Sequence, residues 1–484
     1  MRSLLASLLV VALPAFAAEA PAGLKACRLQ GVEHDAWCGS VQRPLDPARP
    51  GGLMIDVHFA LLPAVARNKK PDPVLFFAGG PGQSAIELAG QVGRLLGRFS
   101  NRRDIVLIDQ RGTGRSAPLQ CSDARSTRPL REQVDPAVQL AELRECRSRL
   151  AALPYGDLRQ FTTSIAMQDA DAVRRRLGAE RVNLVGASYG TRAALDYLRQ
   201  FPQAVRRVVI DGVAPPDMVL PAASSPDAQA AFDALLAACE ADAACRTRYP
   251  QLRSQWHALL ASLPREVTLA HPVTQAEERF PLTREMLLGL VRMPLYVPLL
   301  TSALPLAVTD AAQGRFAPLF GLANGTTSTR RGLALAEGMH FSVVCAEDMP
   351  RLPATGERPG ADFGNGFADL YRRVCAEWPR GEVAADFYRV PPAPVAVLLL
   401  SGAVDPATPP RHAERVAQAL GPKARHVVVP NTGHGVLSIG CLRDVVFRFI
   451  DAETDDDALK VDTTCAAAIP RPSVFVPVAV EGGR

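Results

Sequence analysis

Short apolar runs alternate with amphipathic segments in the first half of the chain. An early run, Leu53–Leu62, suits the antiparallel edge that opens many mixed sheets. A helical pattern with one wet side covers Ser164–Arg176. Four further runs are short enough to be buried strands, namely Val74–Phe77, Asp104–Asp109, Val182–Val185 and Val205–Ile210. This β-α-β rhythm predicts an α/β fold with a mostly parallel central sheet flanked by helices.

The rhythm breaks after about residue 215. Residues 215–394 carry mainly helical patterns joined at prolines, such as Asp227–Ala244 and Thr283–Val291. The strand pattern returns only near the end of the chain, with runs at Val395–Leu400 and His426–Val429 and a final helix expected over Leu442–Asp451. We therefore expect a core in two parts, residues 18–214 and 395–484, and an inserted helical cap over residues 215–394.

The first residues have a different character from the rest. Arg2 precedes an apolar run, Leu4–Leu13, and Ala15-Phe16-Ala17 places small residues on either side of a cleavage position. The pattern predicts a signal peptide over residues 1–17, and the run is too short to span a bilayer well. We expect an exported protein, periplasmic or extracellular, whose mature form has no integral membrane segment.

Ten cysteines agree with export, because an even number in an oxidising compartment suggests disulfides. Pairing each cysteine with the next is the simplest arrangement, since each pair closes a short loop. Zinc sites or buried thiols are the alternatives, but the chain has no C-x-x-C and no histidine at ligand spacing, so we expect no metal. The candidates are Cys27, Cys38, Cys121, Cys146, Cys239, Cys245, Cys345, Cys375, Cys441 and Cys465.

The net charge of +5 comes almost entirely from arginine. The arginines are scattered among acidic residues, with no basic run and no interleaved aromatic residues. This distribution indicates a solvated surface and argues against nucleic acid as a partner.

One Gly-x-Ser-x-Gly stretch, Gly186–Gly190, lies between a predicted strand and a helical pattern that runs to about Gln200. That context distinguishes a nucleophile turn from an ordinary Gly/Ser loop. Side chains at the two glycines would collide with neighbouring backbone in so tight a turn. Ser188 is therefore our candidate nucleophile, at a helix N-terminus where the dipole and free amides favour negative charge.

A serine hydroxyl needs a base to take its proton, and the base needs an acid to orient it. In this architecture the order along the chain is Ser, then Asp or Glu, then His, and each follows a strand. Asp405 follows the strand that ends at Leu400, and His434 follows the strand that ends at Val429. We predict a triad of Ser188, Asp405 and His434.

The oxyanion that forms on attack needs two amide donors. The N–H of Tyr189, directly after the nucleophile, is one candidate, and the N–H of Gly80 in the loop Gly79–Ser84 is the other. A phosphate-binding loop is the competing interpretation of that loop, but no Gly-Lys-Ser/Thr follows it.

The chain carries five motifs in this order: Gly79–Gly82, Asp109–Gly112, Gly186–Gly190, the Asp405 loop and Gly433-His434. Together these motifs resemble the secreted proline iminopeptidase and tripeptidyl aminopeptidase family of α/β-hydrolases. The likeness covers about residues 70–215 and 340–470, and the Cys441–Cys465 tail resembles the tripeptidyl branch. It implies the α/β-hydrolase fold and an exopeptidase that acts on peptides with a free N-terminus and uses no metal or other cofactor. The sequence departs from many relatives at Ala78, where they have histidine.

An exopeptidase of this kind must bind the substrate ammonium group, so a carboxylate is expected in the cap or its hinge. The run Phe341–Asp348 is apolar and ends in two acidic residues. Glu347 is our candidate, with a helix cap or a surface salt bridge as the alternative.

We weigh three hypotheses for the function. A serine aminopeptidase is the leading hypothesis, and a secreted esterase or amidase for small molecules is the alternative with the same triad. A non-catalytic binding protein that keeps the fold is disfavoured by the intact Ser, Asp and His. An epoxide hydrolase or dehalogenase is disfavoured because serine stands where those enzymes carry aspartate.

Overall fold

A nine-stranded sheet organises the core. The computed structural model describes residues 23–121, 127–327, 335–354 and 356–477, so the expected signal peptide lies outside the described residues. In spatial order the strands are β1 (Lys25–Cys27), β2 (Ala36–Pro44), β3 (Met54–Leu62), β5 (Ile105–Ile108), β4 (Val74–Phe77), β6 (Val182–Ala187), β7 (Val205–Asp211), β10 (Val397–Gly402) and β11 (Ala424–Val429). The first three and β5 pair antiparallel, and the strands from β5 to β11 run parallel.

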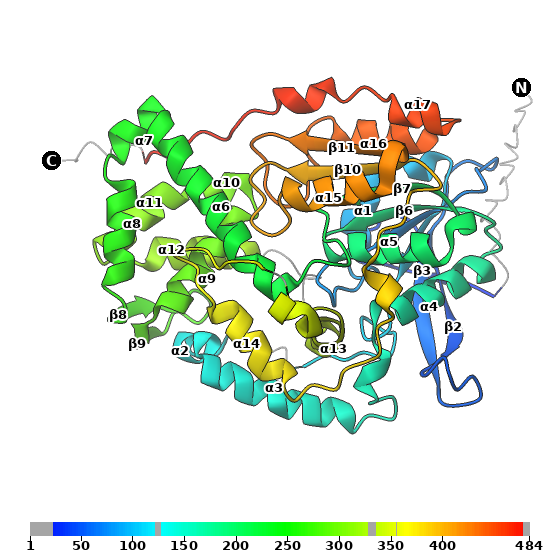
Figure 1. Ribbon diagram of the computed structural model, residues 1–484, viewed down its shortest axis with the longest axis horizontal. Helices are drawn as coiled ribbons and strands as arrows, with labels where there is room; N and C mark the ends of the chain where they lie inside the picture. Colours follow the sequence, from blue (N-terminus) through cyan, green and yellow to red (C-terminus); the bar gives the residue numbers. More distant parts are fainter. Residues whose placement is uncertain (1–22, 122–126, 328–334, 355, 478–484) are drawn as a thin grey trace, which may run out of the picture.

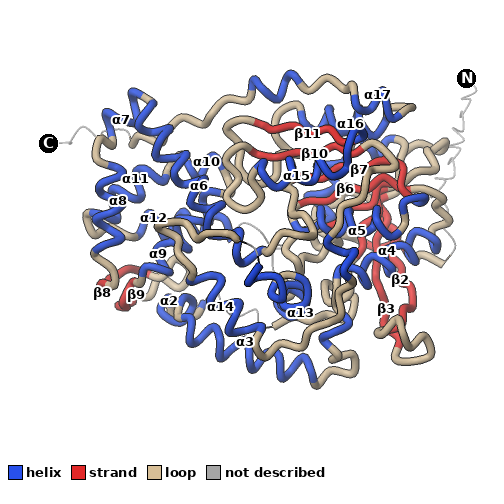
Figure 2. Tube along the Cα trace, in the orientation of Figure 1, coloured by secondary structure: helices blue, strands red, loops and turns tan. Residues whose placement is uncertain are grey.

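The central strands are buried on both faces, as their continuous apolar runs predict. In β4, Leu75 and Phe77 belong to one hydrophobic core, and Val74 and Phe76 belong to the other. Helices α4 (Thr163–Arg176), α5 (Tyr189–Gln200) and α15 (Pro410–Leu420) cover the first face, and α1 (Ala89–Leu96) and α16 (Leu442–Asp451) cover the second. Figures 1 and 2 show these helices on either side of the strands.

Between β7 and β10 the chain builds a cap beside the core (Figure 1). Its helices are α6 (Leu220–Ala241), α7 (Ala243–Arg248), α8 (Leu252–Ala261), α9 (Arg284–Leu295), α10 (Pro298–Thr301), α11 (Leu304–Ala312), α12 (Ala317–Thr327), α13 (Glu337–Glu347) and α14 (Gly366–Cys375). The cap also holds an antiparallel hairpin, β8 (Arg265–Ala270) with β9 (Glu277–Leu282), which the helical patterns did not indicate. The strands of this hairpin alternate buried and exposed residues, so one face joins the cap core.

Two helices from the first part of the chain also contact the cap. They are α2 (Leu130–Val134) and α3 (Pro136–Ala151). Leu130 lies in the cap core, and its N–H donates to Glu278 Oε2 at 2.6 Å. Figure 1 shows α3 beneath α14. The cap is therefore built from two separate stretches of sequence.

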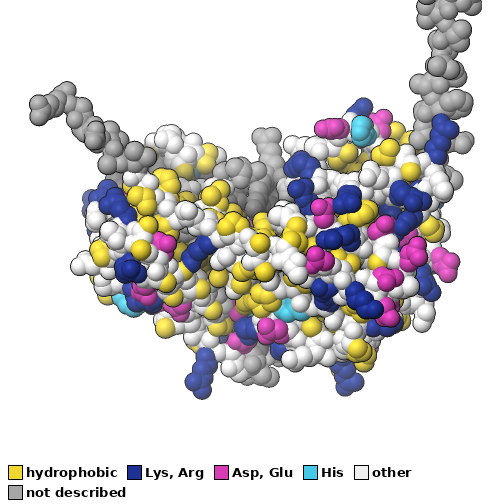
Figure 3. All heavy atoms as spheres, turned by 90° about the horizontal axis from the view of Figure 1, so that it is seen from above, with side chains coloured by type: hydrophobic (Ala, Val, Ile, Leu, Met, Phe, Trp, Pro, Cys, Tyr) yellow, Lys and Arg dark blue, Asp and Glu magenta, His cyan; other side chains and the backbone are white. Residues whose placement is uncertain are grey.

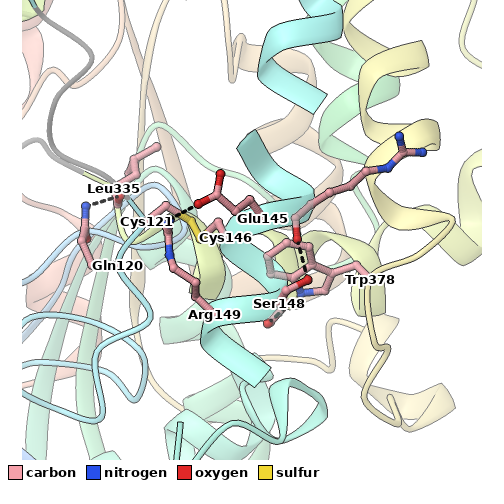
Figure 4. Close-up of a disulfide and its surroundings, with 10 residues drawn as sticks. Gln120, Cys121, Glu145, Cys146, Ser148, Arg149, Leu335 and Trp378 are labelled. Atoms are coloured by element: carbon pink, nitrogen blue, oxygen red, sulfur yellow. Dashed lines mark hydrogen bonds and ion pairs between the residues drawn. A yellow bond between two sulfur atoms is a disulfide. The ribbon is translucent and has the colours of Figure 1, made fainter. Parts of the chain in front are cut away.

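Five disulfides join each cysteine to the next along the chain, which is the simplest pairing expected from the sequence. The pairs are Cys27–Cys38, Cys121–Cys146, Cys239–Cys245, Cys345–Cys375 and Cys441–Cys465. Figure 4 shows the disulfide Cys121–Cys146 tying Cys121 to α3, and there Gln120 Nε2 donates to the carbonyl of Leu335 at 3.3 Å. The disulfides fit an exported protein.

The tail after α16 runs from the core to the cap (Figure 1). Cys441–Cys465 ties Cys465 in this tail to the residue that precedes α16. At its far end Phe475 N–H donates to the carbonyl of Ser302 at 3.0 Å, and Tyr249 Oη donates to the carbonyl of Phe475 at 2.8 Å. Among the described residues, no helix is long and apolar enough to cross a membrane.

Candidate active site

Ser188 occupies the sharp turn between β6 and α5. Its backbone has φ 56° and ψ −126°, a conformation that non-glycine residues rarely adopt. A Cβ on Gly190 would lie 2.1 Å from the carbonyl oxygen of Phe77, and one on Gly186 would lie 2.3 Å from that of Gly190. Only glycine therefore fits at these two positions. Backbone strain of the kind seen at Ser188 is typical of functional sites.

Asp405 and His434 meet beyond the carboxyl ends of β10 and β11. His434 Nδ1 lies 2.8 Å from Asp405 Oδ2, and Asp405 is buried. The other carboxylate oxygen, Oδ1, accepts the backbone amides of Ala407 at 2.8 Å and Thr408 at 3.0 Å. Because Asp405 engages Nδ1, Nε2 is the ring nitrogen left to exchange a proton with a reacting group.

The pKa values of this pair move in opposite directions. Burial alone would raise the pKa of Asp405, but the charge and hydrogen bond of His434 hold it below its ordinary range. Burial alone would lower the pKa of His434, and the charge and hydrogen bond of Asp405 raise it instead. The pair therefore stabilises an imidazolium at His434, which is the species formed when the ring accepts a proton.

Ser188 and His434 line one cavity of about 990 Å³ between core and cap. Gly79 and Gly80 contribute from the core, and Tyr296 contributes from the cap. Within the described residues Ser188 Oγ makes no hydrogen bond to His434, a contact that often tightens only when substrate binds. Figure 3, which views the molecule from above Figure 1, shows charged side chains gathered over the core and more hydrophobic ones toward the middle.

The two predicted oxyanion donors come from separate segments next to Ser188. Tyr189 is the first residue of α5, where backbone N–H groups have no partner within the helix. Gly80 lines the cavity, and a Cβ on the preceding Gly79 would lie 3.1 Å from Ser188 Cβ, so the two segments are close. Gly80 N–H donates to no acceptor among the described residues.

A histidine does support this loop, although Ala78 takes the place of the histidine seen in many relatives. His340 Nδ1, on α13, lies 3.0 Å from the carbonyl of Pro81. Its Nε2 lies 2.7 Å from Tyr371 Oη, and the partial burial of the ring lowers its pKa. The cap therefore supplies a hydrogen-bonding contact to the Gly80 loop.

Glu347 does not reach the cavity. It is the last residue of α13 and is 1% exposed. Its oxygens accept from Thr163 N–H at 2.7 Å and from Thr163 Oγ1 at 3.0 Å, and Arg192 Nη1 lies 3.3 Å away. Burial raises its pKa to about 7. The structure thus places Glu347 in an internal contact between α13, α4 and α5, away from a position where it could meet a substrate ammonium group.

Three further residues hold the site in place and carry no obvious motif. Thr408 Oγ1 donates to Asp405 Oδ2 at 2.8 Å and lies 3.1 Å from His434 Nδ1. The two oxygens of Asp211 accept the amides of Val436 and Leu437 at 3.0 and 2.8 Å, which fixes the loop after His434. The carbonyl of Tyr296 accepts from His434 N–H at 3.0 Å, and its ring packs edge-on against the imidazole. Of these three residues, only Asp211 carries a signal in the sequence, because it stands at the end of a predicted strand.

Two family models match the chain. Residues 72–265 match the model described as alpha/beta hydrolase fold, and residues 361–465 match the model described as TAP-like protein. The first match contains Ser188 and the second contains Asp405 and His434. The chain is an α/β-hydrolase and a serine hydrolase enzyme.

Relatives with known names narrow this class. The chain is 27% identical over 446 residues to serine protease Hip1 of Mycobacterium tuberculosis, covering 86% of this chain and 85% of that protein. It is 31% identical over 192 residues to tripeptidyl aminopeptidase of Streptomyces lividans, covering 37% and 35%. It is also 27% identical over 465 residues to carboxylesterase B of M. tuberculosis, covering 88% and 86%. The likeness to these relatives supports a serine peptidase of the α/β-hydrolase class.

Proposed function

We propose that this chain is an exported serine exopeptidase that hydrolyses peptide bonds near a free N-terminus. The observation that carries the proposal is the 2.8 Å contact between His434 Nδ1 and Asp405 Oδ2, with His434 and the strained Ser188 on the wall of one cavity. The likeness to a tripeptidyl aminopeptidase supports a peptide as the substrate and its N-terminal end as the place of cleavage.

In the proposed reaction Ser188 Oγ attacks the carbonyl carbon and its proton passes to His434 Nε2. The carbonyl oxygen becomes an oxyanion that accepts from the N–H groups of Gly80 and Tyr189, and losing one such donor typically costs about 3 kcal/mol. The carbon–nitrogen bond then breaks and the leaving amine takes the proton from His434. Water repeats the sequence on the acyl-enzyme and frees Ser188.

The test is product analysis on an unblocked peptide and its N-acetylated form. The exopeptidase predicts stepwise release of short fragments from the free N-terminus, with the acetylated peptide resistant. Internal cleavage, or equal cleavage of both peptides, contradicts it. Ser188→Ala and His434→Ala are expected to abolish turnover while folding is retained, which a matching thermal unfolding profile would check.

A small-molecule esterase or amidase is the second candidate, and one feature of the cavity favours it. Among the described residues that line the cavity, the only carboxylate is Asp211, and both of its oxygens already accept backbone amides. Among the described lining residues, the wall therefore offers a substrate ammonium group no uncommitted carboxylate. Faster hydrolysis of N-acylated or ester substrates than of free-amine substrates would favour this second function.

A further inference from the structure

The active-site cavity carries unpaired positive charge at its rim. Arg94, in the last turn of α1, and Arg443, in the first turn of α16, both line the cavity that contains Ser188 and His434. Both arginines are exposed. Within the described part of the chain, neither guanidinium donates to a carboxylate or to a carbonyl oxygen.

These two arginines differ from their immediate neighbours. Arg98, one turn after Arg94, pairs with Asp444, which directly follows Arg443. The guanidinium of Arg98 also lies 4.1 Å from the centre of the Phe447 ring. The same two segments therefore form an ordinary surface ion pair outside the cavity and leave two arginines without partners on its wall.

The charge of Arg443 does not stabilise α16, the helix that carries it. A cation in the first turn of a helix faces the positive end of the dipole, which disfavours it. No acidic residue offsets this at the cavity, because the one described carboxylate on the wall, Asp211, is buried and accepts two amides. Arg292 adds positive charge nearby, since it is one of the groups that lower the pKa of His434. The wall thus favours anions.

We propose that Arg94 and Arg443 bind a carboxylate of the substrate and make this cavity selective for carboxylate-bearing substrates. The inference rests on the proposed function, in which the substrate is a short peptide. Guanidinium groups suit carboxylates because their N–H donors match the two oxygens. The carboxylate can come from an acidic side chain or from the free C-terminus of a short peptide.

The test compares unblocked peptides of one length in four forms, with Glu or Gln at one position and a free or amidated C-terminus. We expect kcat/KM to favour a carboxylate form roughly tenfold at low ionic strength, the equivalent of one charge-assisted hydrogen bond. The preference should lie mainly in KM and shrink in high salt. Preference for Glu over Gln assigns the side chain, and preference for the free over the amidated end assigns the C-terminus.

In the double variant Arg94→Gln/Arg443→Gln, the ratio of kcat/KM for the carboxylate form to kcat/KM for the neutral form is expected to be close to one. Arg98→Gln is the matched control, because it removes a neighbouring arginine outside the cavity, and it should keep the preference. Equal turnover of all four peptides by the wild type, or a preference that survives in the double variant, overturns the inference.

A second substrate pair separates this inference from the proposed function. If none of the peptides is cleaved, the exopeptidase proposal fails, and p-nitrophenyl esters with and without a carboxylate on the acyl chain then make the same comparison. Faster hydrolysis of the carboxylate ester, lost in the double variant, upholds the arginine site. Equal hydrolysis of the two esters contradicts it.

Discussion

Replacing Asp405 by asparagine perturbs the site selectively, because the hydrogen-bond partners of both carboxylate oxygens are defined. One carboxylate oxygen accepts two backbone amides, and the other accepts from His434 and Thr408. The backbone amides cannot turn into acceptors, so the asparagine carbonyl must face them and its NH2 must face His434. The imidazole then has to accept at Nδ1 and carry its proton on Nε2.

That tautomer cannot take the proton of Ser188. The equivalent loss in serine hydrolases is about 10⁴-fold in kcat, or roughly 5.5 kcal/mol of barrier. The assay is turnover of a chromogenic substrate across pH, alongside thermal unfolding. The wild-type rate should fall as pH drops through the pKa of His434, which Asp405 raises above its ordinary value. In Asp405→Asn this acid limb should move to lower pH.

The structure offers a matched control for this substitution. Asp227 is another buried aspartate with a histidine partner, since its Oδ2 lies 2.8 Å from His412 Nε2, and it does not line the cavity. Asp227→Asn is expected to lower thermal stability and keep kcat within a few-fold of the wild type. If both variants lose activity equally, or if Asp405→Asn keeps the wild-type rate, the reasoning is refuted.

Three further outcomes follow from the site. Gly190→Ala should abolish activity and lower the unfolding temperature, because its Cβ would overlap the carbonyl of Phe77; an unchanged unfolding profile contradicts this. Thr408→Val should lower kcat about tenfold by removing a bond to a charged group, and Thr408→Ser should restore it; equal rates in both contradict it. Glu347 has a raised pKa, so its contribution to stability is present below about pH 4.5 and is lost as pH rises through about 7. Glu347→Gln should remove that pH dependence and leave KM for an unblocked peptide unchanged; a selective rise in KM refutes the structural role.

The sequence predicts the Ser188 turn and the positions of the central strands along the chain well because both signals are local. Two glycines around a serine between a strand and a helix specify a backbone geometry whatever lies elsewhere. Each central strand is an uninterrupted apolar run because both of its faces are buried. The contact between Asp405 and His434 then follows from the shared edge of neighbouring parallel strands.

Features that depend on distant partners could not be predicted in this way. The role of Glu347 depends on Arg192 and Thr163, which approach it only after folding. An acidic residue at the end of an apolar run looks the same whether it faces a cavity or a buried arginine. For the same reason, the join of α2 and α3 to the cap gave no local signal.

The central claim is that Ser188 becomes acylated with His434 as its base. The most direct measurement is the mass of the intact protein after treatment with a fluorophosphonate, followed by peptide mapping. We expect one adduct per chain, carried by Ser188, absent in Ser188→Ala and formed far more slowly in His434→Ala. An adduct on another residue, or labelling of Ser188→Ala at the wild-type rate, would contradict the account.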